Sequence, residues 1–415
     1  MPAVIVIGAG ISGLSLALEL HARGYDCRVF DAAPNVASAG VGINIQDYAS
    51  RHLHRLGLED ELQKTSVSPL QAAYASAAGQ ILLKDPIGFA SGSGFPQYSI
   101  HRMALQRVLL HAVEQRLGKE CVSFGHTFLH FQQDQHGVTA NFQASSTYTT
   151  CGDLLVGCDG VHSAVCRQLQ PHLAKVRQSG ITMWRGLTRG IVPPPQPMVV
   201  RCGRIETGKI VTYPIRDPDK PDEVVMNWVA EWRDGRRMKE RHINVSPSSV
   251  PDIFFSMTLD GFDIPSLIQR ADFVLQLPMT DRDPLPYWSQ GRATLLGDAA
   301  HPMYPVGSNG AGQAIVDAAT LAASLDTATS LEAGLQIYES LRGPATAAIV
   351  QHDRAGGPDV VLDAIHKITG GKRLPENMQP EVANQLHVLL ARYQDQSGLA
   401  APQRLASDDA PCVRA

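Results

Sequence analysis

Near its N-terminus the chain reads Val4-Ile5-Val6-Ile7-Gly8-Ala9-Gly10-Ile11-Ser12-Gly13. The β-branched run is typical of a buried parallel strand, and the G-x-G-x-x-G turn behind it opens an amphipathic stretch from Leu14 to Ala22. A second short strand ends at Asp31, close to the spacing at which a carboxylate meets the adenosine ribose hydroxyls. Strand, tight turn, helix and terminal acid together predict a dinucleotide-binding unit.

A second glycine-rich element, Gly297-Asp298-Ala299-Ala300-His301-Pro302, lies far downstream, behind the apolar run Ala293 to Leu296. An aspartate in this position can bond a ribityl hydroxyl. The turn Gly310-Ala311-Gly312 then opens an apolar stretch, so it aims backbone N–H groups and the positive end of a helix at an electron-rich ring. Two distant nucleotide-binding elements imply one long, folded cofactor, which favours a flavin over NAD.

Two weaker signals lie between these elements. An Asp159-Gly160 turn follows a buried strand and presents Ser163 and Arg167 towards phosphates, although an ordinary turn with a surface arginine gives the same pattern. Arg102 and Gln106 lie one helical turn apart on one face, which suits either a cofactor contact or a solvated surface.

Composition limits the class of protein. The 36 basic and 40 acidic residues give a formal net charge of −4, which argues against nucleic acid or an anionic membrane as the main partner. No apolar run reaches about 18 residues and the fingerprint begins at residue 4, so we expect a cytoplasmic protein without a membrane span or a signal peptide. The seven cysteines show no C-x-x-C pair and no metal-ligand spacing, so we expect reduced thiols and no metal site.

The order and spacing of three motifs point to a family. Gly8 to Gly13, Asp159-Gly160 and Gly297-Asp298 resemble the motifs of the class A flavoprotein aromatic hydroxylases, which have the p-hydroxybenzoate hydroxylase fold. Asp31 stands where that family more often has Glu, and nothing in the family matches the residues after 355. Four further strings are most similar to the phenazine hydroxylases of pyocyanin biosynthesis: Gly40 to Gln46, Pro96 to Arg102, Gly180 to Gly186 and Asp281 to Pro286.

The resemblance implies non-covalent FAD, with NAD(P)H and O2 as co-substrates. It also implies hydroxylation, with or without decarboxylation, of a planar aromatic or N-heteroaromatic compound through a flavin C4a-hydroperoxide, in secondary metabolism or aromatic catabolism. A flavin reductase or dehydrogenase on the same fold, without oxygen insertion, is the alternative function. The residues that the resemblance assigns to the cofactor are Gly8, Gly10, Ser12, Gly13, Asp31, Val41, Gly42, Ile43, Arg102, Gln106, Asp159, Asp298, Gly310 and Ala311.

The expected fold is of the α/β class. Strand-like runs between Ile181 and Trp232 predict an antiparallel sheet inserted into a nucleotide-binding domain. We therefore expect a Rossmann-type FAD-binding domain of the GR2 class, an inserted antiparallel β-sheet substrate domain, and C-terminal helices. The expected boundaries are 1–70, 100–178 and 275–345 for FAD binding, 71–99 and 179–274 for the substrate domain, 346–400 for a helical segment and 401–415 for a tail.

The substrate contacts are expected on the inserted sheet and beside the second glycine-rich element. Met183 and Arg185 share one face of a strand by alternation, Tyr213 lies on another strand, and Met303 and Pro305 complete the expected wall. Arg185 is interpreted as a catalytic anchor for a carboxylate or phenolate, but a salt bridge at a strand end explains it nearly as well. Tyr213 is the second catalytic candidate, against a core tyrosine with a satisfied hydroxyl. A monomer or a homodimer is expected.

Overall fold

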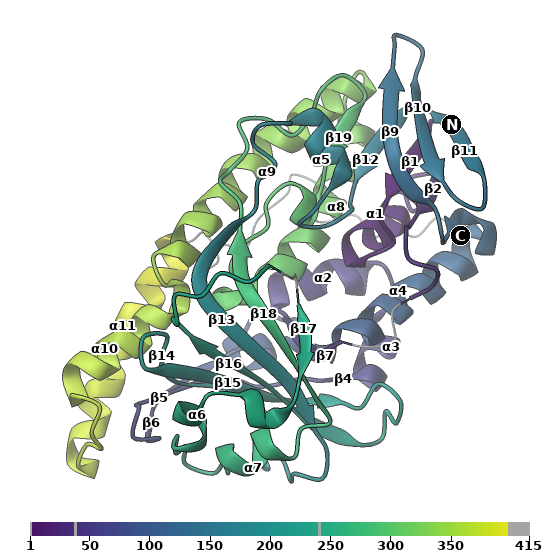
Figure 1. The fold of residues 1–415 in the computed structure, drawn as a ribbon. Coiled ribbons are helices and arrows are strands. Elements are labelled where there is room, and N and C mark those ends of the chain that lie inside the picture. The colour runs from purple at the N-terminus through teal and green to yellow at the C-terminus, as the bar shows by residue number, and fades with distance from the viewer. Residues whose placement is uncertain (1, 37–39, 240–241, 397–415) are drawn as a thin grey trace.

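The computed structural model describes residues 2–36, 40–239 and 242–396. A parallel sheet of five strands holds the N-terminal fingerprint, and helices α1 (Ile11–His21), α4 (Arg102–Leu117) and α8 (Gly310–Thr327) pack beside it (Figure 1). Its central strand is buried on both faces, which explains the continuous β-branched run at its start. In spatial order the strands are β19 (Ala293–Leu295), β12 (Leu154–Gly157), β1 (Ala3–Ile7), β2 (Asp26–Phe30) and β8 (Val122–Ser123).

A larger sheet of eight strands forms the other half of the molecule. In spatial order it contains β17 (Ile243–Val245), β18 (Phe273–Asp281), β13 (Arg177–Thr188), β16 (Val224–Trp232), β15 (Gly208–Arg216), β14 (Met198–Arg204), β5 (Gln71–Ala75) and β6 (Ile81–Pro86). The expectation of a purely antiparallel sheet needs one correction, because β5 and β14 pair in parallel. The reason is connectivity, since β5 and β6 belong to an earlier part of the chain than the other six strands.

The two faces of this large sheet differ. One face carries Trp184 and Trp228, which are fully buried in an apolar cluster with α6 (Asp252–Phe255) and α7 (Ile264–Gln269). Trp228 is therefore a core residue. The opposite face, called the inner face below, carries Met183, Arg185 and Tyr213 and points towards the glycine-rich motifs.

Smaller elements connect the two halves. A three-stranded antiparallel sheet of β3 (Gly42–Ile45), β7 (Tyr98–His101) and β4 (Ser66–Val67) lies between them, next to α2 (Asp47–Arg55) and α3 (Glu59–Thr65). A second antiparallel sheet is built from β9 (Thr127–Gln133), β10 (Val138–Gln143) and β11 (Thr147–Gly152) and is followed by β12 and α5 (Ala164–Leu169).

The C-terminal helices run along one side of the molecule, in green to yellow in Figure 1. Helix α9 (Leu331–Arg354) follows α8, and α10 (Val360–Thr369) and α11 (Gln379–Gln396) pack on β5 and β6 through one apolar cluster. Lys209 on β15 holds this segment in place, because its fully buried ammonium pairs with Glu231 and with Asp359 just before α10.

The expected tail, 401–415, lies outside the described residues. No helix in the described ranges is long and apolar enough to cross a bilayer.

Replacing Lys209 by Met should destabilise the protein by about 3–5 kcal/mol, because two buried carboxylates lose their cation. Burial lowers the pKa of Lys209, but Asp359 and Glu231 outweigh it and raise the pKa above the usual lysine value. The ion pairs therefore contribute at every pH from neutrality to about 10 and are lost only above that. Thermal unfolding compared with Lys220→Met, which removes an exposed pair with Glu223, measures the effect. Equal melting temperatures for the two variants would contradict this account.

Candidate active site

The N-terminal fingerprint and the second glycine-rich element meet at Gly297. An ideal Cβ on Gly297 would lie 3.2 Å from the Cβ of Ser12 on α1 and 3.1 Å from the Cβ of Ala314 on α8. Gly297 also has a φ of +63°, a conformation in which a side chain is strained. The N-terminal ends of α1 and α8 therefore converge on one place, as a single cofactor crossing both motifs requires.

The three fingerprint glycines have different reasons to be glycine. Gly8 has a φ of +108°, and a Cβ there would lie 2.4 Å from the carbonyl oxygen of Cys158. A Cβ on Gly13 would lie 1.9 Å from the carbonyl oxygen of Gly8, so the turn closes directly on the helix. A Cβ on Gly10 would meet no atom within 4 Å. The space in front of Gly10 fits the pyrophosphate of the expected cofactor, whereas Gly8 and Gly13 serve the packing of the turn.

Asp31 and Gln106 both hold the fingerprint turn. The Asp31 carboxylate accepts hydrogen bonds from the backbone N–H groups of Ala9 at 2.7 Å and Ala33 at 2.8 Å. The Gln106 side chain donates to the carbonyl oxygen of Ala9 at 2.7 Å. Both residues thus shape the turn, and a carboxylate retains lone pairs for ribose hydroxyls. Arg102, at the first turn of α4, is exposed, and its backbone N–H donates to the carbonyl oxygen of Val41 at 3.1 Å.

Asp298 is placed to meet a ligand. It is exposed although its neighbours Gly297 and Ala299 are buried, and one carboxylate oxygen lies 3.8 Å from an ideal Cβ on Gly310. The carboxylate therefore stands beside the N-terminus of the 18-residue helix α8, where its positive end favours electron-rich groups. This arrangement fits a ribityl chain bonded to Asp298 and a flavin ring at the helix end.

The turn between Pro305 and Gly312 is held by residues that sequence reasoning missed. Gln46 donates to the carbonyl oxygen of Gly307 at 2.6 Å, and the Tyr48 hydroxyl donates to the Asn309 side chain at 3.1 Å. Ser308, with a φ of +55°, is the one non-glycine residue in the described chain with a positive φ. Strained backbone of this kind persists where the surroundings hold it, and it gathers at functional sites. Gln46 is the last residue of the Gly40 to Gln46 string that carried the family resemblance, and this position was the sequence signal for its role.

A buried polar network lies behind the Gly297–Pro302 element. Asp317 on α8 bonds His301 and accepts from Arg342 of α9 at 2.7 Å. Burial raises the pKa of Asp317, but the nearby His301 and Arg342 outweigh it and lower the pKa to about 2. The ring of Trp288 packs against His301, with 5.3 Å between ring centroids. These contacts give His301 a structural position away from open solvent.

Arg185 and Tyr213 converge on a single backbone atom. The Arg185 guanidinium donates to the carbonyl oxygen of Gly42 at 2.7 Å, and the Tyr213 hydroxyl donates to the same oxygen at 2.8 Å. Asn227, which sequence reasoning missed, accepts from the N–H of Gly42 at 2.8 Å and leaves no room for a Cβ there. Burial raises the pKa of Tyr213, although Arg185 opposes the shift. In this geometry the two catalytic candidates position the loop of Val41, Gly42 and Ile43.

The Asp159-Gly160 turn serves the fold in a similar way. One Asp159 carboxylate oxygen accepts from the backbone N–H groups of Ala164 and Val165 and so caps α5. Arg282, which is 1% exposed, donates to the carbonyl oxygens of Val161 at 2.6 Å and Ala299 at 2.7 Å. The guanidinium therefore ties the Asp-Gly turn to the Gly-Asp element. The sequence signal for Arg282 was its position in the Asp281 to Pro286 string, which carried part of the family resemblance.

Of the predicted substrate residues, Met183, Arg185 and Tyr213 lie on the inner face, whereas Met303 and the exposed Pro305 lie on the turn after Asp298. Met183 is buried on the inner face in a cluster with Val306, the residue after Pro305, and with Val229 and Met279. Met303 is buried in a neighbouring cluster with residues of α9. The turn that follows Asp298 thus packs directly against the inner face of the large sheet.

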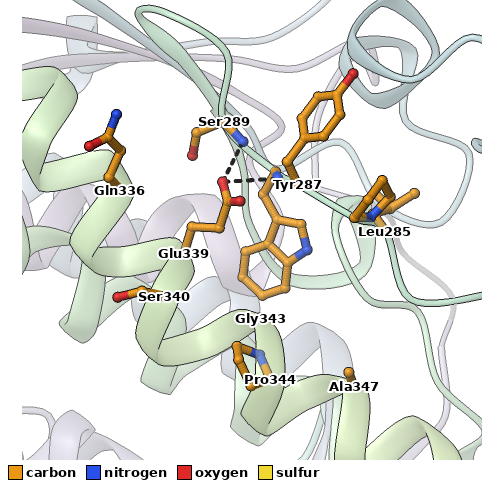
Figure 2. A pocket seen from close by; sticks show the side chains of 11 residues that line it. Leu285, Tyr287, Ser289, Gln336, Glu339, Ser340, Gly343, Pro344 and Ala347 are labelled. Carbon is orange, nitrogen blue, oxygen red and sulfur yellow. Dashed lines mark hydrogen bonds between the residues drawn. The ribbon is translucent and has the colours of Figure 1, made fainter.

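A separate cavity of about 600 Å³ lies elsewhere, between the loop after β18 and helix α9. At its edge, Glu339 of α9 accepts a hydrogen bond from the backbone N–H of Ser289, as Figure 2 shows, and another from the backbone N–H of Trp288. None of the predicted cofactor or substrate residues lines this cavity, so we do not assign it to the active site. No cluster of metal-ligating side chains occurs in residues 2–36, 40–239 and 242–396.

Replacing Gly10 by Ala should leave the apoprotein fold intact, because the methyl group meets no protein atom. It should weaken FAD binding at least tenfold, about 1.4 kcal/mol, because the methyl group enters the space expected for the pyrophosphate. Gly13→Ala is the matched control, in which the methyl group meets the Gly8 carbonyl and should destabilise the protein by about 1–3 kcal/mol. Melting temperature and FAD titration of the apoproteins separate the two effects. Wild-type FAD affinity in Gly10→Ala would remove this glycine from the site.

Comparison with known proteins agrees with this geometry. The FAD binding domain family matches residues 1–353. The phenazine 1,6-dicarboxylic acid hydroxylase of Lysobacter antibioticus is 39% identical over 85% of this chain and 89% of its own length. The 3-amino-4-hydroxybenzoate 2-monooxygenase of Streptomyces cremeus is 32% identical over 85% of each chain.

The structural comparison shows the same fold. HpxO of Klebsiella pneumoniae, solved with FAD and uric acid, is similar with a TM-score of 0.72 and 24% identity over 96% of this chain and 93% of that one. A salicylate hydroxylase substrate complex gives a TM-score of 0.70 at 22% identity, over 97% and 99% of the two chains. Since the family match covers most of the chain, this protein belongs to the FAD-binding flavoprotein monooxygenases that act on aromatic compounds, and FAD is its cofactor.

Proposed function

We propose that the protein hydroxylates a planar aromatic or N-heteroaromatic compound bound on the inner face of the large sheet, beside the turn after Asp298. The observation that carries this proposal is the packing of Val306 against Met183 and Val229, because it brings the cofactor motif and the sheet into one site. The two curated relatives, named for a phenazine dicarboxylic acid and for an aminohydroxybenzoate, support a ring of this kind. The cytoplasmic location and the monomer or homodimer state stay predictions.

Each cofactor residue has a proposed task in this reaction. Gly8, Gly10 and Gly13 with Asp31 hold the adenosine and pyrophosphate end, Asp298 bonds the ribityl chain, and the α8 N-terminus faces the ring. When bound, FAD accepts a hydride from NAD(P)H and activates O2 for transfer to the substrate. The apolar side chains of Met183, Val229 and Val306 exclude water there, which favours transfer of oxygen to the substrate over its loss as hydrogen peroxide.

The same geometry revises the proposed tasks of Arg185 and Tyr213. Both hydrogen bonds end on Gly42, whose loop is expected to flank the flavin ring, so we propose that both are positioning residues. A substrate ring on the inner face would lie against the strands that supply these donors. Substrate binding and placement of the 41–43 loop are then linked through one peptide group.

Arg185→Met and Tyr213→Phe each remove one donor to Gly42 and should raise the share of NAD(P)H recovered as hydrogen peroxide several-fold. FAD content should remain near that of the wild type, because each change removes one of three hydrogen bonds to the peptide. Peroxide assay against product yield measures the partition, with Tyr287→Phe, an exposed tyrosine on a distant loop, as the control. Unchanged partition in both variants would refute the positioning role.

Turnover in labelled dioxygen tests the reaction itself. With phenazine-1,6-dicarboxylate and 3-amino-4-hydroxybenzoate as probes, mass spectrometry should show a product that carries one labelled oxygen atom. A reductase on the same fold would consume NAD(P)H and leave every probe unlabelled. The second outcome, obtained with a wider panel of aromatic compounds, would replace the proposed hydroxylation by the reductase alternative.

A further inference from the structure

A row of side chains crosses the inner face of the large sheet. Arg201 on β14 is paired with Tyr74 on β5 and with Val211 on β15. Val211 is paired with Val229 on β16, and Val229 with Arg185 on β13. Directly paired residues point to the same face of a sheet, so all five share the inner face. Two arginines therefore stand at the ends of a floor of two valines, with backbones roughly 14 Å apart at the usual strand spacing.

Arg201 is a buried cation to which no carboxylate of the described residues is bonded directly. Its side chain is 8% exposed, and its Nε is buried without a hydrogen-bond partner. Within the described residues no hydrogen bond or ion pair joins its guanidinium, which lies over the ring of Tyr74 at 5.6 Å from the centroid. The nearby Asp359 is already bonded to Lys209. Asp359 interacts with Arg201 electrostatically, but no carboxylate in the described residues bonds the guanidinium directly, so its N–H donors are available to an anionic ligand.

The floor between the two arginines is open only at Val211, because Val229 is buried in the cluster with Val306. Val211 lies in the middle of the sheet and is only partly buried on the inner face, and Arg185 is also partly buried. On the opposite face the neighbouring Ile210, Trp228 and Ala230 are fully buried. Ligand sites are mostly apolar and carry a few placed polar or charged groups that orient the ligand, and the partly buried Val211 beside Arg201 combines these two features.

We propose that Arg201 anchors a carboxylate of the aromatic substrate, at the end of the valine floor remote from Gly42. The proposal rests on the proposed hydroxylation and names the substrate class as aromatic carboxylates. A guanidinium matches a carboxylate through two parallel hydrogen bonds, and the carboxylate would supply the directly bonded anion that Arg201 lacks. Arg185 was expected in this role, but its guanidinium is bonded to the cofactor loop. Arg201 thus determines substrate specificity, and Arg185 positions the loop.

Binding to the holoenzyme tests this assignment without any turnover. Titration with phenazine-1,6-dicarboxylate and with unsubstituted phenazine, followed by flavin absorbance, gives both dissociation constants. The wild type should prefer the dicarboxylate, and Arg201→Gln should bind it roughly tenfold to a hundredfold more weakly with phenazine affinity unchanged. Arg204→Gln is the matched control, because Arg204 lies on the same strand but pairs with Asp363 of α10. It should retain the preference.

Three results would overturn the assignment: a wild type without the preference, an Arg201→Gln protein that keeps it, or an equal loss in Arg204→Gln. If Arg201→Gln fails to retain FAD, Arg201→Lys decides, since it keeps the charge and loses the paired hydrogen bonds. Its affinity for the dicarboxylate should fall several-fold, and an unchanged affinity rejects the proposal. The two proposals fail in different experiments. The labelled-dioxygen experiment tests hydroxylation, whereas the binding titration tests the role of Arg201 and gives its result whether or not the protein inserts oxygen.

Discussion

The close packing around Gly297 is the constraint on which the cofactor half of this protein depends. Side chains of α1 and α8 approach the glycine from two sides, and its positive φ suits no other residue well. Only this approach lets two helix N-termini from opposite ends of the chain converge on one ligand. Behind Gly297, Asp317 of α8 bonds both His301 and the α9 residue Arg342, and this network fixes the two helices relative to each other.

The Gly42 peptide is the corresponding junction between the cofactor motifs and the large sheet. Its carbonyl and its N–H are both bonded by side chains of three adjacent strands, namely Arg185, Tyr213 and Asn227. A peptide group held on both sides cannot shift independently of the sheet. The inner face of the sheet and the 41–43 loop therefore belong to one mechanical unit.

Charge is distributed unevenly over the inner face. Lys209 has two carboxylate partners and fastens the C-terminal helices, so its charge is satisfied within the protein. Arg201 lies on the adjacent strand, and within the described residues no carboxylate forms a hydrogen bond or ion pair with it. The contrast between two buried cations of similar depth separates a structural ion pair from a position that awaits a ligand.

The fold class and most cofactor motifs follow from the sequence alone, because they depend on local chemistry. The β-branched run of β1, the close approach of Gly13 to the Gly8 carbonyl and the spacing to Asp31 all involve residues near one another in the chain. The parallel pairing of β5 with β14, the support of the 307–309 turn by Gln46 and Tyr48, and the meeting of Arg185 and Tyr213 on Gly42 were decided only by the tertiary structure. Arg185 lies 143 residues from Gly42, and Tyr213 lies 171 residues away. Strand alternation gives the face on which a long polar side chain stands, but its hydrogen-bond partner is set by whichever distant backbone the packing brings within reach.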